Sequence, residues 1–384
     1  MIEQAKRLET VEEYYFSKKL REVRGLIMEG KPIINMGIGS PDLPPSQAVI
    51  GALRDALSEP NAHQYQSYQG LLELRETIAQ FYGEKYAVTL DPNNEILPLM
   101  GSKEGIMHIS MAFLNEGDEV LIPNPGYPTY SSVSRLVGAE IRLYDLEEKN
   151  NWLPDLAALE KQDLSKVKLM WISYPHMPTG AMADLSELKA IVDFAKRYNI
   201  LLVNDNPYSF VLCEHPVSLL SIAGAKENIL ELNSLSKTFN MAGWRVGMVL
   251  GSEENIKSIL KVKSNMDSGM FYGVQKGAIA ALKSDESWFH SLNTLYNRRR
   301  NKMFQLADQL GCSYDTNSAG MFVWAKLPNK DMSSEEFVDK ILYKKNIFIA
   351  PGTIFGTNGE GYIRFSLCVT EDKIEEAIQR FAAS

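Results

Sequence analysis

Short apolar segments alternate along the chain with longer segments in which apolar residues recur at helical spacing. Strand-like segments lie at 95–100, 119–123, 166–172, 200–203, 228–232 and 246–250. Segments whose apolar residues recur at helical spacing lie between or beside these strands, as in 72–82, 106–114 and 185–198. Such alternation predicts a largely parallel sheet with helices on both faces. We therefore expect an α/β fold with a three-layer α/β/α large domain and a mostly parallel sheet of about seven strands.

The pattern changes after a run of long helices between residues 253 and 310. From Gly311 onward, strands at 322–326, 347–350 and 361–367 alternate with helices at 334–344 and 371–382, which predicts a smaller α+β domain. A chain of 384 residues is also long enough for two domains. We expect an N-terminal arm over 1–45 that returns to the small domain. The large domain would cover 46–283 and the small C-terminal domain 284–384.

Polar and glycine-rich loops follow the predicted strands at 101–103, 127, 174–180, 205–208 and 233–237. In parallel sheets, ligands bind beyond the carboxyl ends of the strands. The first of these loops, Gly101-Ser102-Lys103, lies between a strand and a helix, an arrangement that points free backbone N–H groups at a phosphate. The sequence therefore predicts one ligand site to which all five loops contribute.

The stretch from Asn233 to Gly247 carries the most specific chemistry. Lys237 lies on a predicted loop between two buried strands, where poor hydration favours a neutral, nucleophilic amine. Ser234, Ser236 and Arg245 could bind a dianion. A lysine that forms a Schiff base beside a phosphate clamp is typical of pyridoxal-phosphate enzymes. On this stretch alone, a solvated loop with an ordinary surface lysine is the alternative.

Charge and composition exclude several other classes of protein. Forty basic and forty-eight acidic residues give a net charge of −8, which disfavours nucleic acid or an anionic membrane as partner. The N-terminus has no apolar signal core, and no apolar run is long enough to span a membrane. Cys213, Cys312 and Cys368 are widely spaced without a metal-ligand pattern, so we expect no metal site and a reducing, cytoplasmic location.

Taken together, these segments resemble the fold-type I pyridoxal-phosphate-dependent aminotransferases of class I/II over nearly the whole chain, and most closely the branch of LL-diaminopimelate aminotransferase. The matching stretches are 37–42, 65–70, 101–105, 125–128, 234–238, 243–245 and 261–269. The resemblance implies an enzyme with pyridoxal 5′-phosphate as cofactor that moves an amino group between an L-amino acid and a 2-oxo acid.

The resemblance also implies roles for individual residues. Lys237 would form the carbon–nitrogen double bond with the cofactor and then move a proton on the substrate. Asp205 would keep the pyridine nitrogen protonated, so that the ring accepts electrons from the substrate. Tyr208 would donate to the cofactor's 3′ oxygen, and Tyr127 would stack on the ring. The phosphate would be bound by Gly101, Ser102, Lys103, Ser234, Ser236 and Arg245.

Three further residues would contact the substrate. Arg364 on the last predicted strand would bind its α-carboxylate in a bidentate pair, the alternative being a surface ion pair on an edge strand. Gly39 would contact the substrate backbone. Tyr65 would reach the site of a neighbouring subunit, which implies a homodimer with shared active sites.

The sequence departs from the family pattern at three places. Met177 occupies the position of the usual asparagine, and a thioether cannot donate a hydrogen bond to the cofactor's 3′ oxygen. Residues 271–273 read Phe-Tyr-Gly where the diaminopimelate enzymes carry an asparagine, and residues 65–68 read Tyr-Gln-Ser-Tyr in place of Tyr-Pro-Ser-Tyr. These departures leave the substrate's side chain open.

Two alternatives share this scaffold. A β-eliminating carbon–sulfur lyase would use the same cofactor ligands and differ only in the step after proton removal. A non-catalytic homologue that binds the cofactor without turnover is the other, since the asparagine is missing. A full set of Lys237, Asp205, Tyr208 and Arg364 favours an enzyme.

Overall fold

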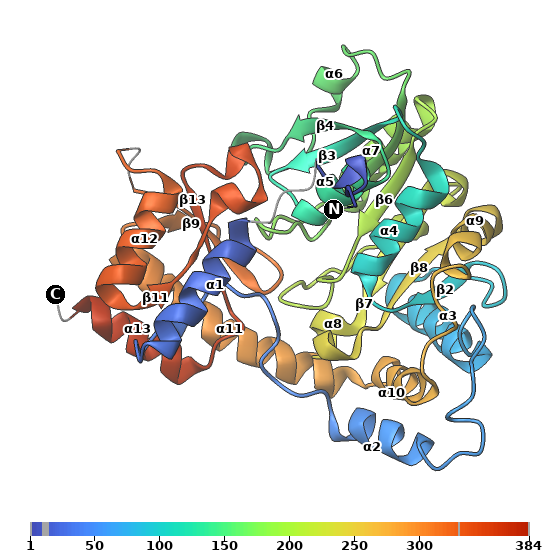
Figure 1. The fold of residues 1–384 in the computed structure, drawn as a ribbon, viewed down its shortest axis with the longest axis horizontal. Helices are drawn as coiled ribbons and strands as arrows, with labels where there is room; N and C mark the ends of the chain where they lie inside the picture. The colour runs from blue at the N-terminus through green and yellow to red at the C-terminus, as the bar shows by residue number, and fades with distance from the viewer. Residues whose placement is uncertain (1, 10–14, 329–330, 383–384) are drawn as a thin grey trace.

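The computed structural model describes residues 2–9, 15–328 and 331–382, which form a larger and a smaller lobe (Figure 1). The larger lobe contains a wide twisted sheet with helices on both sides. In the smaller lobe, the N-terminal helix α1 (Tyr15–Met28) lies beside the C-terminal helices α12 (Ser334–Lys345) and α13 (Glu371–Ala382). The two ends of the chain therefore build one lobe together. The proposed boundaries at 45/46 and 283/284 remain predictions.

Seven strands form the large sheet, in the order β2-β8-β7-β6-β5-β3-β4. They are β2 (Ile96–Leu99), β3 (Glu119–Asn124), β4 (Glu140–Asp145), β5 (Val167–Ile172), β6 (Leu201–Asp205), β7 (Ile229–Ser234) and β8 (Gly247–Gly251). All neighbours are parallel except β8, which is antiparallel to both β2 and β7. The predicted mostly parallel sheet is confirmed. The sequence pattern missed β4, because Tyr144 is the only buried residue of this strand and its hydrophobic alternation is weak.

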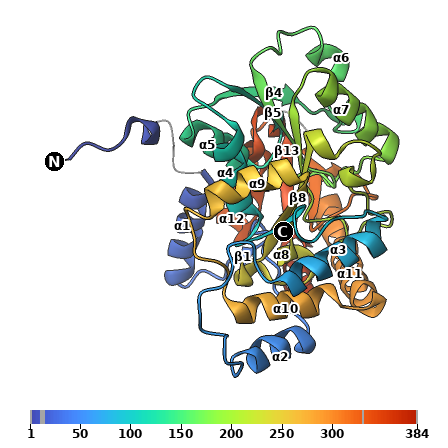
Figure 2. The ribbon, with the colours of Figure 1, turned by 90° about the vertical axis from the view of Figure 1, so that its right-hand side faces the viewer.

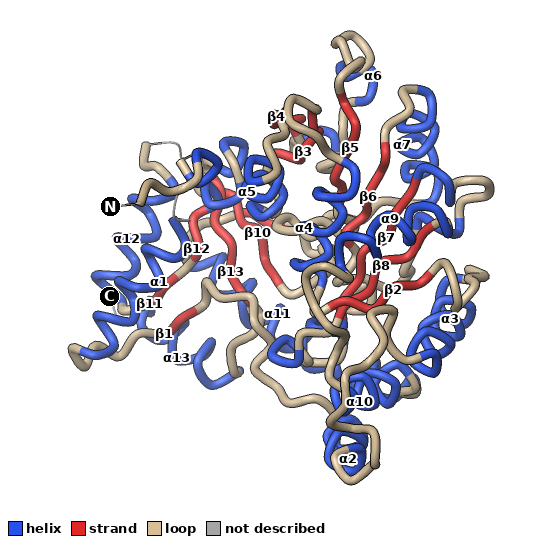
Figure 3. The backbone as a smooth tube through the Cα atoms, turned by 45° about the vertical axis from the view of Figure 1, so that its right-hand side comes forward, coloured by secondary structure: helices blue, strands red, loops and turns tan. Residues whose placement is uncertain are grey.

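Strand residues alternate between two apolar layers, as the period of two requires. In β5, Met170 and Ile172 pack in one core and Leu169 and Trp171 in the other. The first core is covered by α3 (Leu72–Tyr86), α7 (Leu185–Arg197) and α10 (Tyr272–Leu282), and the second by α4 (Ser102–Phe113), α5 (Pro128–Leu136) and α9 (Glu253–Lys263). Figure 3 shows the strands of the sheet running between these helices. The three-layer prediction is confirmed.

The smaller lobe contains a four-stranded sheet in the order β12-β13-β10-β9 and a separate parallel pair, β1 with β11. Its strands are β1 (Ile34–Asn35), β9 (Ser313–Tyr314), β10 (Phe322–Lys326), β11 (Ile347–Phe348), β12 (Ala350–Pro351) and β13 (Tyr362–Ser366). The single strand predicted at 347–350 is wrong, because Ile347 and Phe348 pair with the N-terminal arm whereas Ala350 and Pro351 pair with β13.

Further helices complete the fold. The long α11 (Glu286–Gln309) leads from the larger lobe into the smaller one, while α2 (Gln47–Ala56) packs beside α10 at the end of the larger lobe (Figure 2). Short helices lie at α6 (Leu156–Leu159) and α8 (Leu235–Thr238). Apolar residues at helical spacing over 10–29 also predict a helix, which is described only from Tyr15 because 10–14 lie outside the described residues. Within the described ranges, no helix has both the length and the apolarity needed to cross a bilayer.

Candidate active site

A cavity of about 490 Å³ lies at the carboxyl ends of the strands of the large sheet and reaches the smaller lobe. Residues from α1, β10 and β13 line it together with the strand-end loops. The predicted site residues in its wall are Gly39, Ser102, Lys103, Tyr127, Met177, Asp205, Tyr208, Ser234, Ser236, Lys237, Arg245 and Arg364. All five loops expected at this edge therefore contribute to one cavity.

Lys237 lies in α8, a single helical turn that directly follows β7, and not on an open loop as predicted. The turn forms because the Ser234 hydroxyl caps it by accepting from Ser236 N at 3.0 Å. Nζ of Lys237 donates to the Gly39 carbonyl oxygen at 2.6 Å. Burial lowers the pKa of the Lys237 amine, and the positive charges of Arg364 and Arg245 add to this effect. The amine is therefore more readily neutral, and more nucleophilic, than a solvated lysine.

Asp205 is the last residue of β6 and is buried. Its Oδ2 accepts from the Tyr130 hydroxyl at 2.8 Å, whereas Oδ1 is buried with no partner among the described residues. Burial raises the pKa of Asp205 to about 6, against the opposing effect of the Tyr130 hydrogen bond. The Tyr130 ring stacks on Trp171 with 4.8 Å between ring centroids, which fixes its hydroxyl. Asp205 therefore presents an oriented carboxylate oxygen that can accept from a cationic ring N–H.

The N-terminus of α4 forms the anion-binding part of the cavity. Helix α4 begins at Ser102, so the loop predicted over Gly101-Ser102-Lys103 is wrong beyond Gly101, and the helix starts before the spacing at 106–114 indicated. Gly105 lies inside the helix, where a Cβ would come within 2.5 Å of Leu232 on the sheet. Ser102 and Lys103 therefore lie in the first helical turn, where backbone N–H groups and the helix dipole favour an anion.

Glycine at 101 lets a guanidinium approach this turn. Gly101 has a φ of +90°, and a Cβ there would lie 2.2 Å from Nη2 of Arg245. Behind the turn, a Cβ on Gly247 would lie 2.7 Å from the backbone N of Ser102. The cationic guanidinium can therefore lie against the helix N-terminus, beside the hydroxyls of the β7–α8 junction, and the group suits a phosphate dianion.

Arg364 is fixed between two aromatic rings. Its guanidinium carbon lies 3.9 Å from the Phe322 ring centroid and 4.5 Å from that of Phe355. Nη2 donates to the Gly37 carbonyl at 2.9 Å, and Nη1 lies 3.5 Å from Sδ of Met177. Burial lowers the pKa of Arg364 to about 10, which keeps it cationic at neutral pH. Since β13 lies between β10 and β12, the alternative of a surface ion pair on an edge strand is wrong.

Tyr208 and Tyr127 contribute aromatic surface to the wall. The Tyr208 ring contacts the Phe322 ring edge-on at 5.9 Å, and burial raises the pKa of its hydroxyl, which therefore remains a hydrogen-bond donor at neutral pH. Tyr127 precedes α5 and contacts the Tyr130 ring edge-on at 5.6 Å. Both side chains can face a flat ring bound in the cavity.

Two predicted residues are outside the wall. Gly101 backs the cavity through its contact with Arg245. Tyr65 is 91% exposed on a loop and does not line the cavity of its own chain. Its predicted contact with a neighbouring subunit stays a prediction.

Sequence reasoning missed several wall residues. They are Phe16 and Ser17 of α1, Tyr130, Ser173, Phe322, Ile354 and Phe355. Tyr130 could have been found, because it follows Tyr127 by three residues at the start of one helix and so shares its face. No signal identifies Phe16, since α1 has the pattern of an ordinary amphipathic helix.

Comparison with known proteins identifies the family to which this fold belongs. Residues 31–381 match the family described as aminotransferase class I and II. An LL-diaminopimelate aminotransferase of Nitratidesulfovibrio vulgaris is 39% identical over 381 residues, covering 98% of each chain. A substrate-bound BacF structure from Bacillus subtilis has a TM-score of 0.95 at 35% identity, covering 100% of this chain and 98% of BacF. A probable N-succinyldiaminopimelate aminotransferase from Thermus thermophilus has a TM-score of 0.89 at 32% identity, covering 96% and 99%.

A match over nearly the whole chain, to both sequences and solved structures, shows the family. The lysine, the carboxylate and the helix N-terminus that the sequence singled out lie in one cavity of this fold. The chain belongs to the class I and II aminotransferases, pyridoxal-phosphate-dependent enzymes that transfer amino groups, on the branch that includes the LL-diaminopimelate aminotransferases.

Proposed function

We propose that this transaminase binds pyridoxal 5′-phosphate in the cavity through Lys237 and exchanges amino groups between an L-amino acid and a 2-oxo acid in sites shared by two subunits. One observation carries the proposal. A partly buried amine whose pKa is lowered and a buried carboxylate, whose Oδ1 has no hydrogen-bond partner among the described residues, line the same cavity as a helix N-terminus. Each of these groups suits a different part of the cofactor.

The chemistry of the wall fits the cofactor at its three polar ends. The N-terminus of α4, with Ser102 and Arg245, suits the phosphate. The open Oδ1 of Asp205 suits the protonated pyridine nitrogen, and the amine of Lys237 suits the aldehyde. Because these groups differ in charge and position, they also fix the orientation of the cofactor.

Once bound, the cofactor supplies a ring that withdraws electrons from the Cα–H bond of the amino acid. Asp205 holds the proton on the ring nitrogen, and the Tyr130 hydroxyl keeps that carboxylate oriented and ionised. With its amine neutral, Lys237 would act as the general base that takes the proton from the substrate Cα and as the acid that returns it during transfer. Tyr208 donates its hydroxyl proton toward the 3′ oxygen.

Arg364 binds the α-carboxylate, and its two ring contacts hold the guanidinium plane for a bidentate pair. The side chains that contact it, Phe322, Phe355 and Met177, are apolar. Amino acids with apolar side chains therefore stand first in a donor panel. LL-diaminopimelate is included as a donor in the same panel, because relatives are named LL-diaminopimelate aminotransferases.

The donor panel also separates transamination from elimination. With 2-oxoglutarate as acceptor, a transaminase yields a new amino acid and needs the acceptor for continued turnover. Release of pyruvate and ammonia without any acceptor would instead identify a lyase.

Covalent labelling tests the cofactor assignment directly. Borohydride added to the cofactor-loaded protein should fix the cofactor to Lys237, which peptide mass spectrometry would locate. Lys237→Ala should carry no label, whereas Lys103→Ala should still be labelled at 237. Label on a different lysine, or none, would refute the proposal.

The shared site calls for a separate test. Tyr65 is exposed on a loop that packs, at Gln66, against the backbone of Gly269, which suits a contact with a second copy. We expect a homodimer by light scattering and weak activity of both Tyr65→Ala and Lys237→Ala. Mixing and reassociating the two variants should restore activity, because a mixed dimer contains one intact site. If the mixture is no more active than its parts, the sites are not shared.

A further inference from the structure

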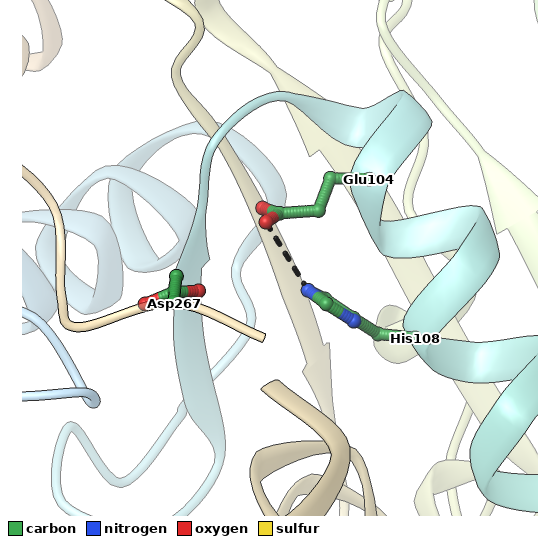
Figure 4. A group of neighbouring side chains, drawn as sticks. All are labelled: Glu104, His108 and Asp267. Atoms are coloured by element: carbon green, nitrogen blue, oxygen red, sulfur yellow. Dashed lines mark ion pairs between the residues drawn. The ribbon is translucent and has the colours of Figure 1, made fainter. Parts of the chain in front are cut away.

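A partly buried charged cluster lies next to the anion-binding turn. It consists of Glu104 and His108 on α4, Asp267 in the loop after α9, and Lys263 at the end of α9. Figure 4 shows the first three side chains facing one another. Their ligand-capable atoms lie within 4.8 Å of one another, a grouping that could suit a metal ion.

Lys263 argues against a metal in this cluster. The lysine is fully buried, and Nζ lies 2.8 Å from both oxygens of Asp267, although only Oδ1 meets hydrogen-bond geometry. A metal ion bound to Asp267 would therefore be brought next to a buried ammonium, a strong repulsion at low dielectric. The cation that balances Asp267 is supplied by the chain itself.

Glu104 connects this cluster to the turn. Its Oε2 accepts from the backbone N of Met100 at 2.6 Å, which fixes the residue before Gly101. Its Oε1 lies 3.2 Å from Nε2 of His108, which is 1% exposed. This is a close approach and not a hydrogen bond, because neither ring nitrogen of His108 meets hydrogen-bond geometry with any described residue. One carboxyl group therefore touches the turn on one side and the cluster on the other.

Asp267 extends the same connection to the predicted subunit contact. Its Oδ1 also accepts from Gly269 N at 2.7 Å. Gly269 has a φ of +89°, and a Cβ there would lie 2.4 Å from the Gln66 carbonyl oxygen. The cluster thus lies between the anion-binding turn and the loop that carries Tyr65.

We propose that Glu104 is a positioning residue, which holds the Met100–Gly101 turn in the shape that binds the cofactor's phosphate. His108 packs against the Glu104 carboxyl group, and Lys263 neutralises the neighbouring carboxylate of Asp267. The proposal depends on the phosphate site proposed above. Glu104 does not line the cavity, so it acts through the backbone of the turn. Its removal weakens binding of the phosphate end of the ligand and leaves the aldehyde end unaffected.

Two ligands separate these ends. Dissociation constants for pyridoxal 5′-phosphate and for pyridoxal, which lacks the phosphate, are measured by absorbance titration of cofactor-free protein. In Glu104→Ala, loss of a hydrogen bond to a charged acceptor should weaken binding of the phosphorylated form about tenfold and change that of pyridoxal less than about twofold. Glu104→Gln keeps an acceptor for Met100 N and should restore most of the affinity.

Glu187 provides a matched control. It lies in the first turn of α7, and its Oε2 accepts from Asp184 N at 2.8 Å, so it makes the same kind of contact at a helix other than α4 and does not line the cavity. Glu187→Ala should change neither constant. His108→Leu keeps the site filled with an apolar side chain and should weaken only binding of the phosphorylated form, by less than Glu104→Ala.

Several results would overturn the inference. Glu104→Ala could weaken binding of both ligands equally, or leave both dissociation constants unchanged. Glu104→Gln could also bind pyridoxal 5′-phosphate as weakly as Glu104→Ala does. If Glu104→Ala does not fold, Glu104→Gln and His108→Leu decide the question. Failure of the proposed function itself is recognised separately, because the wild-type protein would then carry no borohydride label on Lys237.

Discussion

Met177 offers the most direct test of how the cavity sets the chemistry of Lys237. Its Sδ lies 3.5 Å from Nη1 of Arg364, and its side chain lines the cavity with Tyr208. A thioether accepts hydrogen bonds weakly and donates none. In Met177→Asn, the amide oxygen can take over the contact with Arg364, which leaves the NH2 group to donate toward the 3′ oxygen of the bound cofactor.

In the cofactor-loaded protein proposed above, such a donor would stabilise the negative charge on that oxygen once the Lys237–cofactor linkage had lost its proton. The variant should therefore lower the pKa of the linkage. One hydrogen bond contributes about 1 kcal/mol, and one pKa unit corresponds to about 1.4 kcal/mol, so the shift should be about 0.7 unit.

The assay is an absorbance titration of the cofactor-loaded protein against pH. Met177→Leu is the control, since it can neither donate nor accept, and its midpoint should match that of the wild type. A midpoint for Met177→Asn equal to that of the wild type, or an equally large shift in Met177→Leu, would refute the reasoning.

Three other variants test neighbouring parts of the site. Burial raises the pKa of Asp205 to about 6, so the stability that its protonated form contributes is full below pH 4 and is lost as pH rises from about 4 to 6. At pH 7, Asp205→Asn should therefore raise the free energy of unfolding of the cofactor-free protein in urea by about 3 kcal/mol while it abolishes transamination. An unchanged unfolding midpoint would contradict this. Gly101→Ala places a methyl group 2.2 Å from Nη2 of Arg245 at a φ of +90°. It should weaken cofactor binding, measured by absorbance titration, at least about tenfold, and an affinity equal to that of the wild type would contradict this. Arg364→Lys replaces a bidentate pair by a point charge and should raise KM for the amino acid about tenfold or more; an unchanged KM would place the α-carboxylate elsewhere.

The sequence predicted the layers of the fold because strand and helix periods are local properties. Alternation along β5 separates two apolar layers, and the loops after the strands follow from the parallel topology. Lys237 and Asp205 were placed at the predicted ligand site because each lies at or just beyond the end of a buried strand, while the role of Asp205 came from the resemblance to the family. These residues depend on short-range signals, and the structure brings them to one cavity.

Other features depend on contacts between distant segments, which no local pattern encodes. The Arg364 guanidinium lies between Phe322 and Phe355, which come from separate segments of the smaller lobe. The break between β11 and β12 arises because the N-terminal arm takes one of two possible partners. The start of α4 at Ser102 was missed because apolar residues recur at helical spacing only from 106. Gly105 lies inside the helix, where the lack of a side chain allows close packing on Leu232.

The pairing of β1 with β11 has a consequence for folding during synthesis. Ile34 emerges from the ribosome early, but its partner Ile347 is added near the end of translation. The large sheet, which ends at Gly251, can form first, whereas the carbonyls of Gly37 and Gly39 reach Arg364 and Lys237 only when both termini have met. A nascent chain stalled before residue 347 should therefore hold a folded sheet with an incomplete ligand site. The ligand site is then completed only at the end of synthesis, after the large sheet has folded.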